Sequence, residues 1–553
     1  MGLYDYNGFA PYPAWELDFK EVSASPAEYA GDPEFYIEES GPARVTVKTV
    51  RRARNSVFEM YISLETGGEY VSVFNEIEWR SLRTLLKTEF PLAAQNEKAV
   101  YDLGLGVIER GVNTKRLYEV PAQNFAAVRD RSGSFSTAVF SDSRCGWDRP
   151  DENTLRLTGM HSPLAAYRDA QHLLDFGKNR YSFAVCGVDG DSLAQIQQRS
   201  AEFMQPMAAF SVSASGGSLG SSFSFMKVEG NAVVRALKKA QSGDELVLRV
   251  NECEGKSGKV SVQIGTAICS ARAILASEEP CGREDFSVSD GVLTFGLKPF
   301  EVRSFALKTE NSPKTAGTVC VPIELDCNYT EAVSNGGYAG HETAPLELLP
   351  ERISCGGVEF FPDSRGFAMS CCGQTLKLPA NADRLHILAA RAGGDSPTQI
   401  KLGGKTCVFT VLSETERPGA WDNYYMGHTG YIKPGTLGWC FTHSHGEKCD
   451  IIAKQRYFFK YSFDIENGTD SVILPEDESI IILAATATLN ENKCETAFPM
   501  FDELEKREFD FRLSDEDERR AHNAKKEGIL GRCKFVRNYA VRRLKTELKQ
   551  RFG

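Results

Sequence analysis

The sequence predicts a mainly β protein, in which antiparallel sheets form sandwiches and a short, charged tail follows at the C-terminal end. Two observations predict this class. Apolar and polar residues alternate with a period of two in several runs, which is typical of strands with one buried face. Glycines and other turn residues separate these runs, as expected for antiparallel hairpins.

The clearest hairpin is expected at residues 56–79. In SVFEMYISL, residues 56–64, every second side chain from Phe58 onward is apolar, and YVSVFNEIEW, residues 70–79, continues the pattern. Gly67 and Gly68 lie between the two runs and mark the turn. The later runs ELVLRV and KVSVQIG show the same alternation, so the antiparallel region extends well beyond this hairpin.

One helix interrupts the strand-like pattern. Ser192 is its expected N-cap, Gln195 follows three residues later as in a capping box, and Pro206 ends it. The spacing of Leu193, Ile196 and Phe203 is close to helical, which predicts a connecting helix packed on a sheet.

The chain divides into three parts. A polar segment with a proline and a glycine, ENSPKTAGT, marks a boundary near residue 310, and a second series of strand-like runs follows it. We therefore expect one domain at residues 1–310 and a second, smaller one at residues 311–490. We expect residues 491–553 to form a charged, partly helical tail, whose basic amphipathic end packs on the body or on the acidic segment just upstream.

Composition narrows the possible partners and the location. The formal net charge of −11 argues against nucleic acid as a partner. The most apolar run is about half a membrane span, so no membrane partner is expected. The fifteen cysteines lack the spacing of a zinc ribbon, which favours free thiols in a reducing compartment and predicts a cytoplasmic protein.

The stretch SDSRCGWDRPDENTLRLTGMHSP, residues 141–163, concentrates polar residues and a tryptophan around turns. An aspartate can accept hydrogen bonds from two adjacent sugar hydroxyls, and a tryptophan can stack on the sugar ring. Aspartates are also common in turns and at caps without any ligand. The residue types alone leave both interpretations open.

A second group of interest is the histidine pair His443 and His445. Two residues two positions apart share one face of a strand, and Cys440 and Cys449 are near in sequence. A zinc site and a hydrogen-bonded pair near a strand end both fit this pattern.

Four segments resemble, in the same order, the C-terminal β-rich portion of the glycoside hydrolase family 38 α-mannosidases. They are NEIEWRSLRTLLKTEFPL, YEVPAQNFAAV, the stretch at residues 141–163, and DFGKNRYSFAV. Beyond residue 310, LLPERISCGGVEF, GQTLKLPANADRLHILAA and GWCFTHSHGEKCD resemble the final β-sandwich of bacterial members. The resemblance implies a large antiparallel β-supersandwich, then a smaller β-sandwich.

The resemblance also implies where the reaction belongs. Family members keep a zinc ion and an aspartate nucleophile in an N-terminal α/β barrel with a histidine-x-aspartate motif, and none of the eight histidines here is followed in that way. We therefore expect no cofactor in this chain, zinc in a separate catalytic barrel domain or chain, and a mannose-containing glycan as ligand. The alternatives are a non-catalytic carbohydrate-binding or scaffold protein, and an unrelated enzyme site at Asp142, Asp148 and Asp175.

The same resemblance supplies candidate substrate-binding residues that would line the cleft beside the barrel. His161 stands where many relatives have arginine, and Asn179 where many have histidine, so the contacts are expected to differ from the family pattern. No catalytic and no metal-binding residue is assigned. The predicted substrate-binding residues are Asp142, Arg144, Trp147, Asp148, His161, Asp175 and Asn179.

Overall fold

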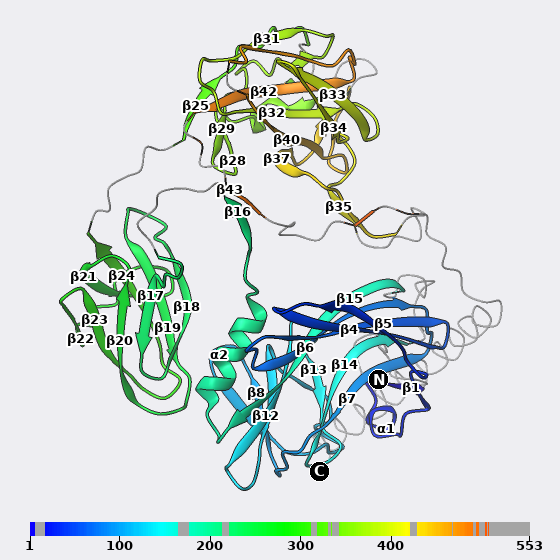
Figure 1. Ribbon diagram of the computed structural model, residues 1–553, viewed down its shortest axis with the longest axis vertical. Coiled ribbons are helices and arrows are strands. Elements are labelled where there is room, and N and C mark those ends of the chain that lie inside the picture. Colours follow the sequence, from blue (N-terminus) through cyan, green and yellow to red (C-terminus); the bar gives the residue numbers. More distant parts are fainter. Residues whose placement is uncertain are drawn as a thin grey trace, which may run out of the picture.

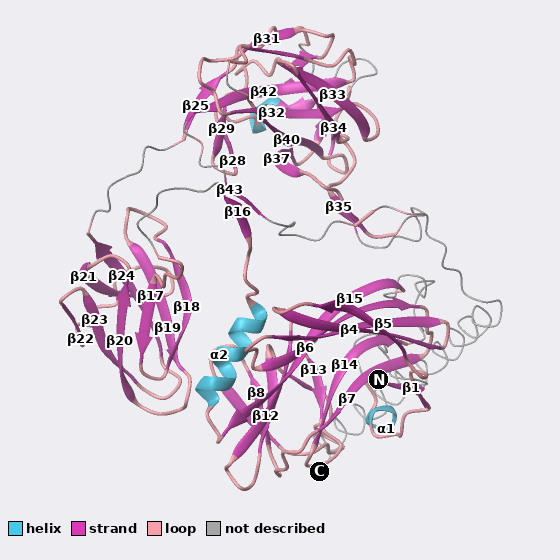
Figure 2. Cartoon of the chain, viewed as in Figure 1, coloured by secondary structure: helices cyan, strands magenta, loops and turns pink. Residues whose placement is uncertain are grey.

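The computed structural model confirms the mainly β class (Figure 1). In the part of the chain that it describes, strands predominate and two α-helices occur, α1 (Phe19–Val22) and α2 (Leu193–Met204) (Figure 2). The described residues are 1–5, 17–163, 176–212, 220–310, 318–329, 333–334, 342–420, 429–466, 468–489, 491, 494–496, 504–505 and 507.

The first sandwich, residues 2–189, consists of two antiparallel sheets. The six-stranded sheet has the order β10 (Val120–Pro121), β13 (Gly146–Asp148), β14 (Thr154–Ser162), β7 (Thr84–Pro91), β1 (Gly2–Asp5) and β2 (Glu28–Tyr29). The nine-stranded sheet has the order β3 (Glu34–Ser40), β4 (Arg44–Ala53), β5 (Ser56–Glu65), β6 (Tyr70–Trp79), β15 (Gly177–Asp189), β12 (Phe135–Ser141), β11 (Phe125–Arg129), β8 (Ala99–Asp102) and β9 (Val107–Arg110).

One hydrophobic core fills the space between these two sheets. Leu86 and Phe90 enter it from β7, and Phe58, Ile77 and Phe183 enter it from the nine-stranded sheet. The rings of Phe90 and Phe183 meet edge to face, with centroids 5.1 Å apart. Full burial of side chains of this size contributes roughly 2 kcal/mol each, so the core holds the two sheets face to face.

The predicted hairpin is confirmed as β5 and β6, with Ile62 opposite Val73. Near the middle of the sheet this face is buried in the core, because alternate residues of both strands point the same way. Toward the turn the same face is uncovered, and Leu64 and Val71 are 49% and 37% exposed. The apolar face of the nine-stranded sheet therefore continues past the core.

A β-bulge in β14 changes which residues face the core. The pairing of β14 with β7 shifts between Thr158 and Met160, which leaves Gly159 as the extra residue. A Cβ atom at Gly159 would lie 2.7 Å from the Tyr181 hydroxyl, so only glycine fits there without a shift of that side chain. After the bulge, Ser162 faces the core, where it accepts a hydrogen bond from the Trp79 indole.

The predicted helix is confirmed as α2. The Ser192 side chain accepts a hydrogen bond from the backbone N–H of Gln195, as expected for an N-cap. Leu193 and Ile196 are buried in a core that α2 shares with residues of β12 and β15, on the side of the nine-stranded sheet that faces away from the main core.

A loop from the next domain also caps α2. The Glu254 carboxylate accepts hydrogen bonds from the Ser192 hydroxyl and the Ala194 N–H, both at 2.6 Å. A negative charge is favourable there because the N-terminus of a helix carries a partial positive charge. Gln197 donates to the carbonyl of Cys253 at 3.1 Å, so α2 is bonded to this loop at two points.

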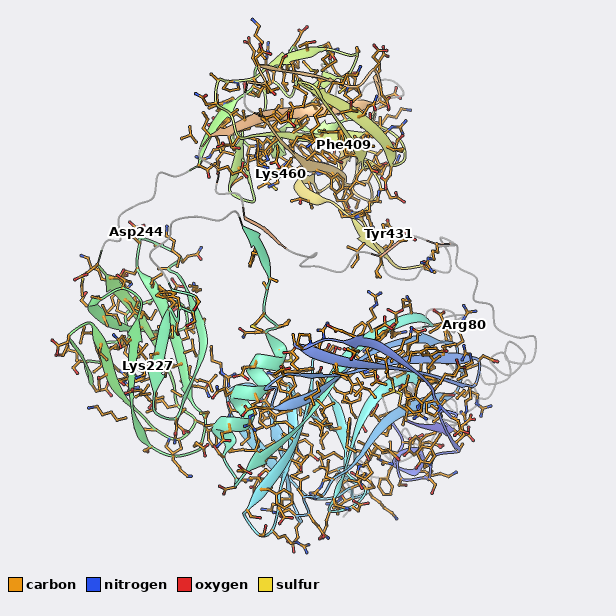
Figure 3. The ribbon with its side chains drawn as sticks, in the orientation of Figure 1. Arg80, Lys227, Asp244, Phe409, Tyr431 and Lys460 are labelled. Carbon is orange, nitrogen blue, oxygen red and sulfur yellow. The ribbon has the colours of Figure 1, made fainter. Side chains whose placement is uncertain are left out.

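The second sandwich, residues 226–309, has two four-stranded antiparallel sheets. Its surface carries exposed charged side chains such as Lys227 and Asp244 (Figure 3). No described strand ladder joins it to the first sandwich, so the expected range 1–310 contains two groups of sheets. One sheet is β17 (Met226–Glu229), β20 (Gly258–Ile264), β23 (Val292–Leu297) and β22 (Phe286–Ser289); the other is β18 (Ala232–Lys239), β19 (Leu246–Glu252), β24 (Val302–Thr309) and β21 (Ile268–Ile274).

The third sandwich, residues 319–489, packs a six-stranded sheet on a four-stranded one. Phe409, labelled in Figure 3, lies against Tyr461 between them, with ring centroids 5.1 Å apart. The six-stranded sheet comprises β25 (Val319–Pro322), β42 (Ile480–Leu489), β32 (Arg384–Arg391), β40 (Arg456–Asp464), β37 (Thr436–Phe441) and β30 (Met369–Ser370). The four-stranded sheet comprises β31 (Thr375–Lys377), β41 (Ser471–Ile473), β33 (Ser396–Leu402) and β34 (Lys405–Val411).

Short strand pairs complete the described structure. Apart from the short described pieces near its start, the predicted helical tail at residues 491–553 lies outside the described residues. The short pairs are β16 (Phe210–Val212) with β43 (Cys494–Thr496), β26 (Val333–Ser334) with β27 (Ala344–Pro345), β28 (Ile353–Cys355) with β29 (Val358–Phe360), β35 (Gly419–Ala420) with β36 (Tyr431–Ile432), and β38 (Ser444–His445) with β39 (Asp450–Ile451); η2 (Leu346–Leu348) is a 3-10 turn.

Candidate functional site

A buried group of charged residues lies on the outer face of the six-stranded sheet. On β7, Leu86 and Phe90 point into the core, so the alternate residues Leu85, Lys87 and Glu89 point to the opposite face. Lys87 is fully buried there. A buried lysine needs a counter-charge, because an unpaired ammonium group is costly to remove from water.

Asp148 is the centre of this group, which we call the Asp148 cluster: Lys87, Glu119, Asp148, Arg156 and Thr158. The Arg156 Nε atom lies 3.1 and 3.0 Å from the two Asp148 carboxylate oxygens. The Lys87 ammonium donates to Asp148 at 2.8 Å, to Glu119 at 2.7 Å and to Thr158 at 2.8 Å. The charges are therefore paired and their hydrogen bonds directed, which is the condition for burying ions in a protein interior.

The N-terminal region covers the Asp148 cluster. Arg156 donates to the Val22 carbonyl and to the Tyr4 hydroxyl, both at 2.8 Å. Tyr118 donates to the carbonyl of Leu17 at 2.6 Å and meets the ring of Phe19 edge to face. The cluster thus ties α1 and β1 to β7, β13 and β14.

Asp142 and Arg144 lie in the turn between β12 and β13, at the surface. The Asp142 side chain is exposed, and its carboxylate accepts from the Ser182 N–H at 2.9 Å and from the Ser143 hydroxyl at 2.7 Å. The Arg144 guanidinium lies 4.9 Å from the Tyr181 ring centroid, a cation–π arrangement. Asp142 is therefore accessible, whereas Arg144 is half-buried and its Nε atom is covered; both are held in place by their neighbours.

Trp147 and Asp148 have a different position from the one expected of substrate contacts. Trp147 is fully buried in the core, and Asp148 is 1% exposed with its oxygens paired as described above. Alternation along β13 explains this, since one side chain must face the core and the next the covered outer face. In this structure neither side chain is accessible to a glycan.

His161 and Asn179 lie on different sheets. His161 is on β14 opposite Leu85, and Asn179 is on β15 opposite Ile77, where its side chain donates to the carbonyl of Gly177 at 3.2 Å. Burial, and then the charge of Lys87, lower the pKa of His161 to about 4. His161 therefore joins the edge of the Asp148 cluster as a neutral imidazole, and Asn179 does not.

The structure groups four of the predicted residues in two places. Asp142 and Arg144 share the exposed turn, whereas Asp148 and His161 share the covered face with Lys87, which the sequence analysis missed. Its signal is a lysine directly after two leucines in the strand-like run TLLKTEF, because a lysine in a buried strand needs a paired charge. Asp175 lies outside the described residues, and glycan contact by any of these residues stays a prediction.

A group that could hold a metal ion lies on the third sandwich. His443 and His445 share one face, as predicted, with ring centroids 5.3 Å apart, and Glu347 approaches both. Cys440 and Cys449 are exposed and do not belong to this group.

The described features define the class of the protein as a chain of three β-sandwiches, in which the thirteen described cysteines are free. Among the described helices, none has the length and apolar character needed to cross a bilayer. Residues 2–166 match the family model "Glycosyl hydrolases family 38 C-terminal domain", and residues 231–305 match "Glycosyl hydrolases family 38 C-terminal beta sandwich domain". The first and second sandwiches are therefore similar to the C-terminal domains of glycosyl hydrolase family 38.

The third sandwich has a separate match. Residues 322–491 match the model "AziU2-like beta-sandwich domain". The sequence analysis placed the final β-sandwich of family 38 beyond residue 310, whereas the family model places it in the second sandwich. The two regions share the same period-two alternation, so the pattern alone does not distinguish them.

Named relatives agree with the family. The chain is 24% identical over 270 residues to alpha-mannosidase 2C1 of Mus musculus and over 269 residues to that of Homo sapiens. Each match covers 47% of this chain and 25% of the relative, so it spans a quarter of the relative's length. Among solved structures, an alpha-mannosidase of Enterococcus faecalis V583 is 14% identical, with a TM-score of 0.42 over 50% of this chain and 35% of that one.

Lys87→Met is expected to lower the free energy of unfolding of the first sandwich by about 3–5 kcal/mol, because it leaves the Asp148 and Glu119 carboxylates without their shared cation. Urea unfolding followed by tryptophan fluorescence measures this, since Trp79 and Trp147 lie in the adjacent core. Lys98→Met is the matched control. Lys98 forms an exposed pair with Glu109, and its loss is expected to cost less than about 1 kcal/mol. Equal effects of the two changes would contradict a structural role of the cluster.

Acid is expected to destabilise the first sandwich through His161. The pKa of His161 is about 4 in the folded chain and about 6.5 when unfolded. Between these values the unfolded chain binds the extra proton, so stability falls as the pH falls from about 6.5 to 4, by up to roughly 3 kcal/mol. Unfolding curves across this range, compared with His161→Gln, measure the effect. The variant should show a shallower slope, and an unchanged slope would rule the contribution out.

Proposed function

We propose that this chain is the β-rich portion of a glycosidase of α-mannosidase type, which holds a mannose-containing glycan beside a catalytic barrel domain or chain. The observation that carries the proposal is the match of residues 2–166 and 231–305 to the C-terminal models of family 38. The names of the mouse and human relatives supply the substrate class. The free cysteines favour a cytoplasmic location.

The Asp148 cluster does not suit hydrolysis. Glycoside hydrolysis needs one carboxyl group as acid and a second as nucleophile or base. The Asp148 carboxylate is bound by Lys87 and Arg156, and the same lysine holds Glu119. These cations occupy the carboxylates, and they leave Asp148 with no free oxygen for a zinc ion. The residues of the Asp148 cluster do not fit the family's catalytic zinc, which we assign to the barrel.

The exposed turn suits glycan binding better. Asp142 already accepts two hydrogen bonds from this chain, and its carboxylate has about four acceptor positions, so two remain for sugar hydroxyls. Arg144 supplies several N–H donors beside it and is oriented by the Tyr181 ring. Adjacent hydroxyls of a mannose unit match this pairing of acceptor and donor groups.

An uncovered apolar surface supports a docked partner. The inner face of the nine-stranded sheet, which forms the core farther along, carries exposed apolar side chains on β3 to β6. Phe35, Ile37 and Val45 are 66%, 77% and 47% exposed, and Leu64 and Val71 continue the same face. Contiguous apolar patches of this kind mark interaction sites. We assign this surface, called the β3–β6 patch, to the barrel.

Release of nitrophenol from an aryl α-mannoside tests whether catalysis requires the barrel in addition to this chain. The purified chain is expected to show no turnover with zinc or cobalt beyond a chelator control, and turnover is expected to appear when a separately produced barrel is added. Ile37→Lys should reduce this complementation, because it places a charge in the β3–β6 patch. Tyr36→Lys is the matched control, since Tyr36 is also exposed but points to the opposite face. Metal-dependent turnover by the chain alone would overturn the proposal.

Calorimetry with mannosides tests the binding role separately. The wild-type chain is expected to bind a mannoside without converting it, and Asp142→Asn should weaken the affinity by about tenfold, because a hydrogen bond to a charged group is lost. Asp244→Asn is the control, since Asp244 is fully exposed on the second sandwich. Equal affinities of the wild-type chain and Asp142→Asn would exclude the turn as the glycan site. Binding that persists without any response to an added barrel would favour the scaffold alternative.

A further inference from the structure

Three side chains on the third sandwich converge on one point. Glu347, in the 3-10 turn η2, has one carboxylate oxygen 3.6 Å from the Nε2 atom of His443 and the other 3.2 Å from the Nε2 atom of His445. All three potential ligand atoms lie within 4.8 Å of one another. Residues about a hundred positions apart in sequence are thus brought together by the fold.

The second ring nitrogen of His445 fixes the orientation of the first. His445 Nδ1 lies 2.7 Å from a carboxylate oxygen of Asp450, on the neighbouring strand β39. When Nδ1 carries the proton and donates it to Asp450, Nε2 presents a lone pair toward Glu347. A carboxylate behind a histidine is the usual outer partner of a histidine that ligates a metal.

The Nε2 atom of His445 faces the Glu347 carboxylate at 3.2 Å, within hydrogen-bonding distance, with His443 beside them. When the proton of His445 is on Nδ1, both facing groups are acceptors. Two facing acceptors repel unless a cation lies between them. The basic residues Lys454 and Arg456, which both bond to the hydroxyl of Ser444, have their own carboxylate partners in Glu342 and Glu414.

The backbone around the histidines is held firmly. The N–H of His445 donates to the carbonyl of Thr343 at 2.9 Å, and the N–H of Thr343 donates back at 3.1 Å. Ser444, between the histidines, is fully buried, donates to the Lys454 carbonyl and accepts from Arg456. The ligand atoms are therefore positioned in advance, which lowers the cost of binding an ion.

We propose that Glu347, His443 and His445 bind a divalent transition-metal ion of the zinc type, with Asp450 orienting His445. Zinc–ligand bonds of about 2.0–2.1 Å in a tetrahedron place neighbouring ligand atoms roughly 3.3 Å apart. One Glu347 oxygen lies 3.2 Å from His445 Nε2 and the other 3.6 Å from His443 Nε2, so either oxygen is near this spacing from one histidine. Imidazole ligands favour zinc, cobalt or nickel over magnesium and calcium, which prefer oxygen. Three protein ligands leave one position for water or for a donor group of an incoming molecule.

Cobalt titration of the full chain tests this proposal without any activity assay. After chelator treatment and dialysis, the wild-type chain is expected to bind one equivalent more Co²⁺ than His443→Ala or His445→Ala, with visible bands of a four-coordinate nitrogen and oxygen site. Glu347→Gln is expected to lose the same equivalent and, because Glu347 is half exposed, to keep its fold. Circular dichroism checks that each variant is folded.

Two further variants separate the proposed site from alternatives. Asp450→Asn is expected to weaken Co²⁺ binding roughly ten- to a hundredfold while leaving the number of sites unchanged. The double variant Cys440→Ser, Cys449→Ser is the control, since both thiols are exposed near the histidines in sequence. It should bind as the wild type does. Equal binding by the wild-type chain and the histidine variants, or loss of the equivalent in the cysteine control, would overturn the proposal.

Discussion

The pairing of Asp148 with Lys87 and Arg156 is the interaction on which the first sandwich depends. It joins three neighbouring strands of one sheet, and through Arg156 it also fixes α1 and β1. Burial of such ions is costly, and a buried pair of this kind is weak evidence for stability alone. Its stronger effect is on specificity, because a shift of β14 by one residue would turn Arg156 into the apolar core and leave Asp148 unpaired.

This constraint explains why a stretch with the composition of a sugar site is mostly structural. Residues 141–163 supply a core tryptophan, a cluster aspartate and the bulge that sets the register. The turn around Asp142 remains exposed, as do Pro150, Asp151 and Asn153 in the turn between β13 and β14. A glycan-binding role is thus restricted to the part of the stretch that the sheets leave free, and the exposed apolar side chains of β3 to β6 lie on a different part of the same sandwich.

The sequence predicts the elements better than their assembly. The hairpin of β5 and β6 and the helix α2 follow from local rules, since a period of two and a capping box act within a few residues. The shared face of His443 and His445 follows from the same period. The partners of Asp148 and the approach of Glu347 to the histidines do not, because the fold brings these contacts together from distant positions. Strands of the first and second sandwiches have the same alternation, so the period alone does not show where one group of sheets ends and the next begins.

The order of strands in the nine-stranded sheet has a consequence for biosynthesis. β15 is the last of these strands in the chain, yet it lies in the middle of the sheet, between β6 and β12. Until residue 189 has emerged from the ribosome, β6 and β12 each present an unpaired edge with apolar neighbours. Such edges pair readily with other chains. The nascent first sandwich is therefore most open to aggregation just before β15 emerges, and chaperone binding at that stage would protect it most.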